Sequence, residues 1–279
     1  MTDFPPVSDR DLTQTIRFSR RIRAHALRMV HRANASHIGT CLSMADLLAA
    51  LYVDVLRYRP TQPDWPARDR FILSKGHGTA VLYATLAESG FFPRSWLDEY
   101  TQDGSRLLGH ASHHVPGIEL STGSLGHGLS VGCGMALAAK RDGQAHRTFV
   151  LLSDGELDEG SVWEALLFAP QHGLDNLIAI IDYNKIQSFG TVEEVLNLAP
   201  LAEKLRAFRW AVVEVDGHDH SAIRSALTQL PLQEGKPTAI VAHTVKGKGV
   251  SFMEDRLAWH YKSPNAEQLV AALAELGEA

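Results

Sequence analysis

Two short apolar runs with a helix-length segment between them constrain the fold of this chain more than any other feature. Residues 148–152 form the first run, which is followed by Asp154, and residues 177–181 form the second, which is followed by Asn184. Continuous apolar runs of this length, joined by a helix, are typical of strands in a parallel sheet that is covered on both faces. Because open α/β sheets bind ligands at the carboxyl ends of their strands, we expect a ligand site at these two polar residues.

The residues at the two strand ends offer a set of oxygen ligands. The carboxylate of Asp154, the amide oxygen of Asn184 and a nearby main-chain carbonyl such as that of Ile186 are hard donors that suit Mg²⁺, and also Ca²⁺ or Mn²⁺. These oxygens are too few to complete an octahedral shell, so diphosphate oxygens and a water molecule would have to supply the rest. The sequence therefore predicts a site for a divalent metal ion and a diphosphate.

The same segment resembles the thiamine diphosphate-binding motif, in which a Gly-Asp-Gly turn precedes a helix and an Asn follows the next strand. Asp154, Gly155 and Asn184 match this motif in order and separation. Taken alone, Asp-Gly is a turn signal and Asn184 a loop residue, so the agreement of both strand ends carries the interpretation. Ser153 replaces the first Gly of the motif, and Ser adopts positive φ less readily than Gly.

Strand and helix signals alternate along the rest of the chain. We expect strands at 70–73, 148–152, 177–181, 211–215 and 238–242, and helices at 10–33, 43–56, 126–141 and 265–276, with another helix that ends near residue 88. Ser43 is expected to cap the second helix, with Asp46 three residues on. This alternation predicts an α/β fold with a mostly parallel sheet that helices flank on both faces. Since no linker divides the sequence, we expect a single domain over residues 1–279.

Composition excludes several classes of protein. Of the 279 residues, 45% are hydrophobic and 21% charged, as in ordinary globular proteins. The formal net charge of −5 argues against nucleic-acid binding. The cysteines, Cys41 and Cys133, suggest no disulfide framework. Residues 1–23 show no secretory leader, and no apolar run is long enough to cross a membrane, so we expect a cytoplasmic protein without membrane contact.

The chain contains 14 histidines, and some of them supply a second set of signals. Those that follow a glycine or lie where a strand gives way to a loop are His37, His77, His110, His127 and His260. A single His in such a place is usually a structural residue. However, the contexts ANASHIGTCLSMAD, ILSKGHG, LLGHASHH, STGSLGHG and LAWHYKSP occur in the order and spacing found in transketolases. From residue 15 to residue 264, the chain therefore resembles the diphosphate-binding, N-terminal part of the transketolase family.

The resemblance implies a role for each matching residue. The histidines that match residues acting on the sugar substrate are His37, His77, His110 and His260. The residues that match contacts to thiamine diphosphate are Thr40, His77, Gly123, Ser124, Leu125, Asp154, Gly155, Glu156, Asn184, Lys246 and His260. The implied metal ligands are Asp154, Asn184 and the carbonyl of Ile186. Glu159 and Glu164 match acidic residues near a subunit interface, whereas His113, His114 and His127 depart from the family pattern and receive no role.

The chemistry of these residue types suits the implied roles. A diphosphate needs a cation and donors, which a metal ion, lysine and main-chain N–H groups supply. Sugar hydroxyls need donors and acceptors near neutral pH, and imidazole is both. The segment Lys246-Gly247-Lys248-Gly249 alone would be interpreted as a solvated basic loop. Beside a predicted diphosphate, Lys246 is better interpreted as a cofactor contact.

Transketolases continue with a pyrimidine-binding domain that supplies a glutamate to the cofactor ring, and this chain ends soon after the matching region. The resemblance therefore implies the N-terminal subunit of a split transketolase. Its expected partner is a C-terminal subunit with the pyrimidine-binding and C-terminal domains, in an α2β2 heterotetramer with active sites at the interfaces. An apolar patch near Gly123, Ser124 and Leu125 is expected to mark the partner surface.

The expected reaction transfers a two-carbon ketol unit from a ketose to an aldose, with the cofactor as electron sink. One alternative is the alpha subunit of a 2-oxo acid dehydrogenase, which the histidine set disfavours. Another is a non-catalytic cofactor-binding subunit, which the intact ligand set disfavours. A dinucleotide-binding dehydrogenase is disfavoured because no G-x-G-x-x-G opens a helix after the first strand. The sequence does not identify the sugars or say whether they are phosphorylated.

Overall fold

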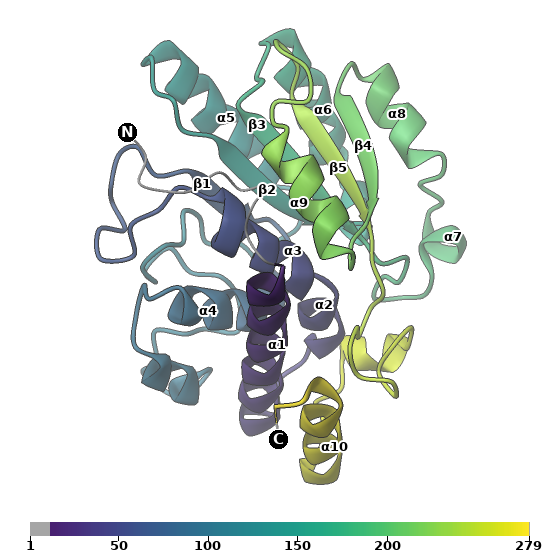
Figure 1. Cartoon of the computed structure of the whole chain (residues 1–279). Coiled ribbons are helices and arrows are strands. Elements are labelled where there is room, and N and C mark those ends of the chain that lie inside the picture. The colour runs from purple at the N-terminus through teal and green to yellow at the C-terminus, as the bar shows by residue number, and fades with distance from the viewer. Residues whose placement is uncertain (1–11, 279) are drawn as a thin grey trace.

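The computed structural model describes residues 12–278, and its centre is a five-stranded sheet in the order β1-β2-β3-β5-β4. The strands are β1 (Arg70–Leu73), β2 (Thr148–Ser153), β3 (Leu177–Tyr183), β4 (Ala211–Asp216) and β5 (Thr238–His243). All of their pairings are parallel. Figure 1 shows this sheet running through the upper part of the molecule, with helices on both sides. The predicted strands and the predicted α/β class are confirmed.

Alternate residues of the strands face two separate cores. In β2, Phe149 and Leu151 belong to one core, and Val150 and Leu152 belong to the other. The helices that contribute to the first core are α1 (Thr13–Ala33), α2 (Ile38–Ser43), α3 (Ala45–Ala50), α4 (Thr79–Glu88), α9 (His220–Thr228) and α10 (Ala266–Leu276). Those of the second core are α5 (Gly128–Arg141), α6 (Gly160–Gln171), α7 (Val192–Val195) and α8 (Leu201–Ala207). Since both of their faces are buried, the central strands β2, β3 and β5 are largely apolar, which explains their continuous runs in the sequence. The edge strand β4 differs, because its Glu214 and Asp216 are exposed.

One close approach of helix to sheet depends on a small residue. A Cβ atom at Gly132 of α5 would lie only 2.6 Å from Cγ2 of Val150. The glycine therefore lets the helix backbone pack directly on β2. At Gly134, two residues further along the same helix, a Cβ atom would meet nothing within 4 Å.

The parallel register brings the carboxyl ends of the strands together at one edge. Ser153 of β2 pairs with Asp182 of β3, and Tyr183 pairs with His243 of β5. The segments that follow these strands therefore start side by side. This is the edge at which the sequence predicts a ligand site.

The predicted helix at 43–56 is wrong in its boundaries. Residue Ser43 ends α2, α3 begins at Ala45 after the N-cap residue Met44, and a π-helical turn covers Leu51–Val55. Ser43 is not a cap, because its hydroxyl donates to Asp182 at 2.6 Å. Distant buried partners have outcompeted the local capping pattern, which the sequence alone does not reveal.

The other predicted helices are present with small shifts at their ends. The predicted start of the first helix, at residues 10 and 11, lies outside the described residues, as does much of the segment searched for a leader. The last helix, α10, begins with a capping box between Asn265 and Gln268. Among the described residues, no helix has the length and apolar character needed to cross a membrane.

Candidate functional site

A pocket of about 250 Å³ lies at the carboxyl edge of the sheet. Its lining consists of His37, Thr40, His77, His110, Gly123, Leu125, Ser153, Asp154, Gly155, Asn184, Ile186, Gln187, Ser188, Lys246 and His260. These residues come from segments far apart in the sequence, which the strand register and the helices of the first core bring together. Of the predicted site residues, only Ser124 and Glu156 are absent from the lining.

Four histidines form a cluster on one side of this pocket. The ring centroid of His37 lies 5.1 Å from that of His77, 6.4 Å from that of His110 and 4.9 Å from that of His260. Burial is the main cause that lowers the pKa of His37 to about 4 and that of His260 to about 3, and it holds the pKa of His77 well below its usual value. At neutral pH these three rings are therefore uncharged, and each can donate one hydrogen bond and accept another.

His37 is held in an unusual backbone conformation. Its φ of 73° lies in the left-handed region, which non-glycine residues seldom occupy. Its N–H donates to the carbonyl of His260 at 2.9 Å, so a main-chain hydrogen bond joins the two candidate catalytic residues. The side-chain Nδ1 of His37 is buried and has no hydrogen-bond partner in the described part of the chain. Strain together with an unsatisfied polar atom is typical of a residue positioned for a ligand.

The predicted metal ligands Asp154, Asn184 and Ile186 form another part of the lining, here called the metal wall. Asp154, which is 1% exposed, accepts hydrogen bonds from the main-chain N–H groups of Gly155 at 2.7 Å and Lys185 at 2.5 Å. Asn184 Oδ1 accepts from the N–H of Ile186 at 3.2 Å. These local bonds fix the direction in which the side-chain oxygens point. Among the described residues, no group of three or more His, Cys, Asp or Glu forms a metal cluster, so any metal here would depend on mixed oxygen ligands.

The charge state of Asp154 indicates what this wall lacks. Burial raises the pKa of Asp154 to about 6, and the charge of nearby Asp182 contributes to the rise. Lys75 and the main-chain N–H groups of Gly155 and Lys185 lower the pKa without offsetting these two effects, so an added cation would stabilise the ionised carboxylate. A divalent cation would do so, and the carboxylate, amide and carbonyl oxygens are of the kind that Mg²⁺ prefers. The donor set therefore fits the predicted metal.

Lys246 links this wall to the histidine cluster. Its ammonium donates to the carbonyl of Ile186 at 2.8 Å and lies 3.0 Å from Nδ1 of His260. The residue is only 2% exposed, and burial lowers the pKa of its side chain to about 8. The interpretation as a solvated loop thus fits Lys248, which pairs with Glu254 near the surface, and does not fit Lys246.

Glu156 supports the pocket from behind. Its carboxylate accepts hydrogen bonds from the Ser74 hydroxyl, from the N–H of Gly126 at 2.9 Å and from the N–H of Ser153 at 3.4 Å. The side chain therefore holds the loop before α5 against the ends of β1 and β2. Its predicted contact with the cofactor remains a prediction. Ser153, which replaces a motif glycine, ends β2 without positive φ, so the motif needs no glycine there in this chain.

A fully buried ion pair under the pocket was missed by sequence reasoning. Lys75 donates to Asp182, and the hydroxyls of Ser43 and Thr244 donate to the same carboxylate. Burial alone would raise the pKa of Asp182, but Lys75 outweighs it and lowers the pKa. The only sequence signal was the position of Lys75 in ILSKGHG and of Asp182 at a strand end. Their separation of 107 residues hid the partnership.

Two further lining residues, Gln187 and Ser188, were also missed. They directly follow the predicted ligand Ile186, so the signal was continuation of the same loop. Gln187 lies against the motif glycine, since a Cβ atom at Gly155 would come within 3.2 Å of Gln187 Cγ.

Several residues that the sequence singled out lie away from the pocket. His113 and His114 are exposed, and Nδ1 of His113 is 2.7 Å from the hydroxyl of Ser121. His127, Glu159 and Glu164 are exposed as well. For the two glutamates, a place near a subunit interface stays a prediction.

Comparison with known proteins defines the class. The family described as "Transketolase, thiamine diphosphate binding domain" matches residues 15–277. The chain belongs to this family. It is 45% identical to one of the subunits of the apulose-4-phosphate transketolase of Phocaeicola vulgatus over 260 residues, which cover 93% of this chain and 92% of the relative. It is 44% identical to the SqwG subunit of the 6-deoxy-6-sulfo-D-fructose transketolase of a Clostridium species, with 91% and 93% covered.

Solved structures agree with the sequence relatives. The transketolase of Campylobacter jejuni matches with a TM-score of 0.91 and 32% identity over 96% of this chain, and the transketolase of Leishmania mexicana with 0.89 and 33% over 94%. This chain spans only 43% and 41% of those two chains. The predicted family, the thiamine diphosphate-binding fold and the class of transketolase subunit are confirmed.

Proposed function

We propose that this chain is the N-terminal subunit of a two-chain transketolase that transfers a two-carbon ketol unit from a ketose to an aldose. One observation carries the proposal: a single pocket is lined both by Asp154, a buried carboxylate whose pKa is raised, and by a cluster of neutral histidines. The first feature suits a metal-bound diphosphate, and the second suits a polyhydroxylated substrate.

At the metal wall, the side chains of Asp154 and Asn184 and the carbonyl of Ile186 would hold Mg²⁺, or Ca²⁺ or Mn²⁺ in its place. Thiamine diphosphate, when bound, supplies a carbon nucleophile and an electron sink. The Lys246 ammonium would neutralise part of the diphosphate charge and orient the diphosphate. The residues that position the remainder of the cofactor, directly or through the loop before α5, are Thr40, Gly123, Ser124, Leu125 and Glu156.

At the histidine wall, His37, His77, His110 and His260 bind and orient the sugar. A neutral imidazole can donate to a carbonyl oxygen and accept from a hydroxyl, so it can also carry a proton between them. The unsatisfied ring nitrogen of His37 suits such a contact. His77 and His260 lie near each other, and His260 also lies beside Lys246, which suits contact with both substrate and cofactor.

The proposed partner is a C-terminal subunit with the pyrimidine-binding and C-terminal domains, in an α2β2 assembly. Relatives that this chain covers almost end to end are named as transketolase subunits, which supports a separate partner. We further propose that residues 1–279 act as one domain and that the protein works in the cytoplasm on small sugars, without nucleic acid. The relatives' names make apulose 4-phosphate and 6-deoxy-6-sulfo-D-fructose the first substrates to try.

The test is a ketol-transfer assay on the chain with and without its partner, with Mg²⁺ and thiamine diphosphate present throughout. We expect turnover only for the mixture, and light scattering should show two copies of each chain. Robust turnover by the isolated chain would refute the two-chain proposal. A stable mixed assembly that binds the cofactor and transfers nothing from any ketose would refute the activity.

A further inference from the structure

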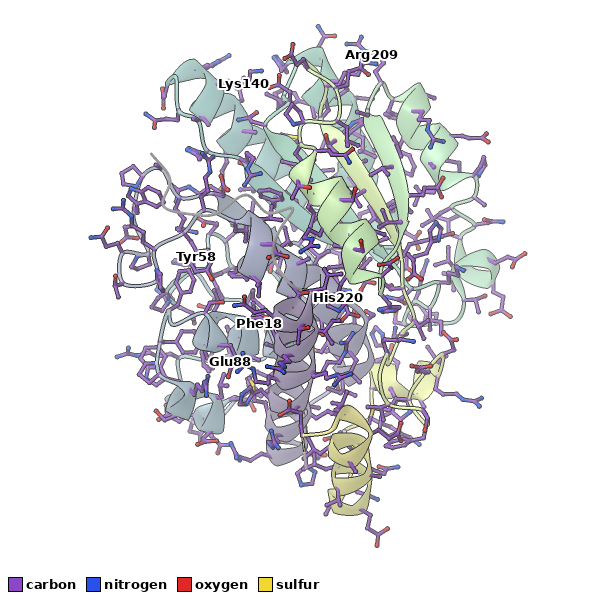
Figure 2. All side chains as sticks on the ribbon, in the orientation of Figure 1. Phe18, Tyr58, Glu88, Lys140, Arg209 and His220 are labelled. Atoms are coloured by element: carbon purple, nitrogen blue, oxygen red, sulfur yellow. The ribbon has the colours of Figure 1, made fainter. Side chains whose placement is uncertain are left out.

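A buried cluster of charged side chains lies outside the pocket. Asp46 of α3 is 4% exposed and accepts two hydrogen bonds from Arg23 of α1, at 2.8 and 2.6 Å. His218, in the turn after β4, and His220, the first residue of α9, contact the same carboxylate at 2.8 and 3.2 Å. Figure 2 labels His220, which lies where α9 meets the N-terminal helices. The cluster thus fastens the β4–α9 turn to the helices of the first core.

The second ring nitrogen of His218 reaches the loop that carries Lys246. The main-chain N–H of Val245 donates to Nε2 of His218 at 2.8 Å. A ring nitrogen that accepts a hydrogen bond carries no proton, so the proton of the neutral ring is on Nδ1, where it is donated to Asp46. Asp46 therefore selects the tautomer in which His218 can accept from Val245, much as carboxylates orient histidines in metal sites.

The turn that carries His218 is itself packed on this loop. Gly217 N–H donates to the carbonyl of His243 at 2.8 Å, and a Cβ atom on Gly217 would overlap Cγ2 of Thr244. His218 N–H donates to the carboxylate of Asp216 at 2.8 Å. The ring is therefore fixed by the main chain on one side and by Asp46 on the other.

Val245 needs this acceptor because it lies beyond the end of β5, where the sheet no longer satisfies its N–H group. Without an acceptor, a partly buried N–H group would turn toward water and take the neighbouring peptide with it. The next residue is Lys246, whose ammonium must stay near Ile186 and His260 to face the pocket.

We propose that His218 is a positioning residue: oriented by Asp46, it fixes the Val245–Lys246 main chain and so places the Lys246 ammonium for the cofactor diphosphate. The inference rests on the proposed function for the identity of that ligand. The effect of His218 on the loop does not depend on the ligand, so it can be measured without one.

Two substitutions separate the ring nitrogens. His218→Asn places an amide near the position of Nδ1, keeps a donor for Asp46 and removes the acceptor for Val245. His218→Gln carries a carboxamide oxygen near the position of Nε2 and keeps that acceptor. The matched control is His243→Asn, which removes a histidine–carboxylate contact of 3.0 Å, to Glu214, from the exposed end of β5.

The first measurement is hydrogen exchange of the Val245 amide in the isolated chain without cofactor. The second is the dissociation constant of thiamine diphosphate at saturating Mg²⁺, measured by calorimetry on the two-chain enzyme. In His218→Asn we expect faster exchange at Val245 and about tenfold weaker cofactor binding, equivalent to about 1.4 kcal/mol. His218→Gln and His243→Asn should stay close to the wild type in both measurements.

Unchanged exchange at Val245 in His218→Asn would overturn the inference, as would equal loss of cofactor affinity in the Asn and Gln variants. A fall in thermal stability alone, with wild-type affinity, would show that His218 merely supports the fold and would also overturn it. If the wild-type enzyme binds no thiamine diphosphate, the proposed function fails, while the exchange experiment still decides whether His218 fixes the loop.

Discussion

At the scale of single residues, we expect substitution of Asp154 to affect metal binding most, since it is the only carboxylate among the described residues that line the pocket. Asp154→Ala removes the one anionic protein ligand for the proposed metal. We expect metal-dependent binding of thiamine diphosphate to weaken by more than about a hundredfold, because even an outer-shell partner of a metal is worth about ten- to hundredfold. Calorimetric titration in complex with the partner measures this, and an affinity equal to that of the wild type would refute the metal assignment.

The histidines should affect turnover rather than folding. Alanine at His37 or His110 removes a donor expected to strengthen in the transition state, so turnover should fall by about a hundred- to thousandfold while cofactor binding persists. Variants of His77 and His260 should lose both turnover and cofactor binding. His113→Ala is the control, because that histidine is exposed and outside the pocket. Steady-state kinetics with separate kcat and KM values measure these effects. Wild-type turnover in one of the alanine variants would mean that the replaced histidine is structural.

At the scale of elements, the contact between α5 and β2 allows a matched pair of substitutions. Gly132→Ala introduces a methyl group 2.6 Å from Val150 Cγ2, and such overpacking typically costs about 1–3 kcal/mol. Gly134→Ala meets open space in the same helix, so it should be neutral or stabilising by up to about 1 kcal/mol. Urea denaturation of both variants gives the comparison. Equal stabilities would show that α5 can move away from the sheet at no cost.

The amino-terminal ends of β1 and β2 are joined by an ion cluster with a defined pH dependence. Asp69 contacts Arg57 at 2.8 Å and Arg147 at 2.6 Å. Burial alone would raise the pKa of Asp69, but the two arginines outweigh it and hold the pKa below the usual 3.8. Its stabilising contribution is therefore present above about pH 4 and is lost as the pH falls through the lowered folded-state pKa.

Asp69→Asn should accordingly destabilise the chain by about 1–3 kcal/mol at pH 7, the typical cost of removing the hydrogen-bond partner of groups that are partly buried. The variant should also lose less stability than the wild type as the pH falls below about 4. Denaturation curves across this range test both parts, and parallel pH profiles for the two proteins would contradict the assignment of the pKa shift.

The elements also show how far sequence reasoning reaches. The strands were predictable because burial on both faces leaves an unbroken apolar run, as in residues 148–152. Motif residues such as Asp154 and Asn184 were predictable because strand ends of a parallel sheet must meet. Hydrogen bonds between residues far apart in the sequence were not predictable. Ser43 looked like a cap, but its hydroxyl bonds Asp182, 139 residues away, and no local pattern encodes that choice.

At the scale of the whole molecule, we expect the stability of the assembled enzyme to depend on bound cofactor. In the assembled enzyme, removal of Mg²⁺ by a chelator should release thiamine diphosphate and lower the apparent melting temperature. A ligand present at a hundred times its dissociation constant contributes about 2.7 kcal/mol to the folded state, so the shift should be large enough for calorimetry to detect. Asp154→Ala, which already lacks the metal ligand, should show little further change on chelation. An unchanged wild-type melting curve would mean that the metal does not hold the cofactor.

The single acid in the pocket has a consequence for how the site fills. One carboxylate attracts a lone divalent cation only weakly, and the same carboxylate repels a diphosphate that arrives without one. Metal and diphosphate neutralise each other, so each should bind far more tightly when the other is already in place. Such thermodynamic coupling is reciprocal: whatever factor Mg²⁺ adds to the affinity for thiamine diphosphate, the cofactor must add to the affinity for Mg²⁺. We therefore expect the chain to bind Mg²⁺ and thiamine diphosphate together, and to bind either one alone only weakly.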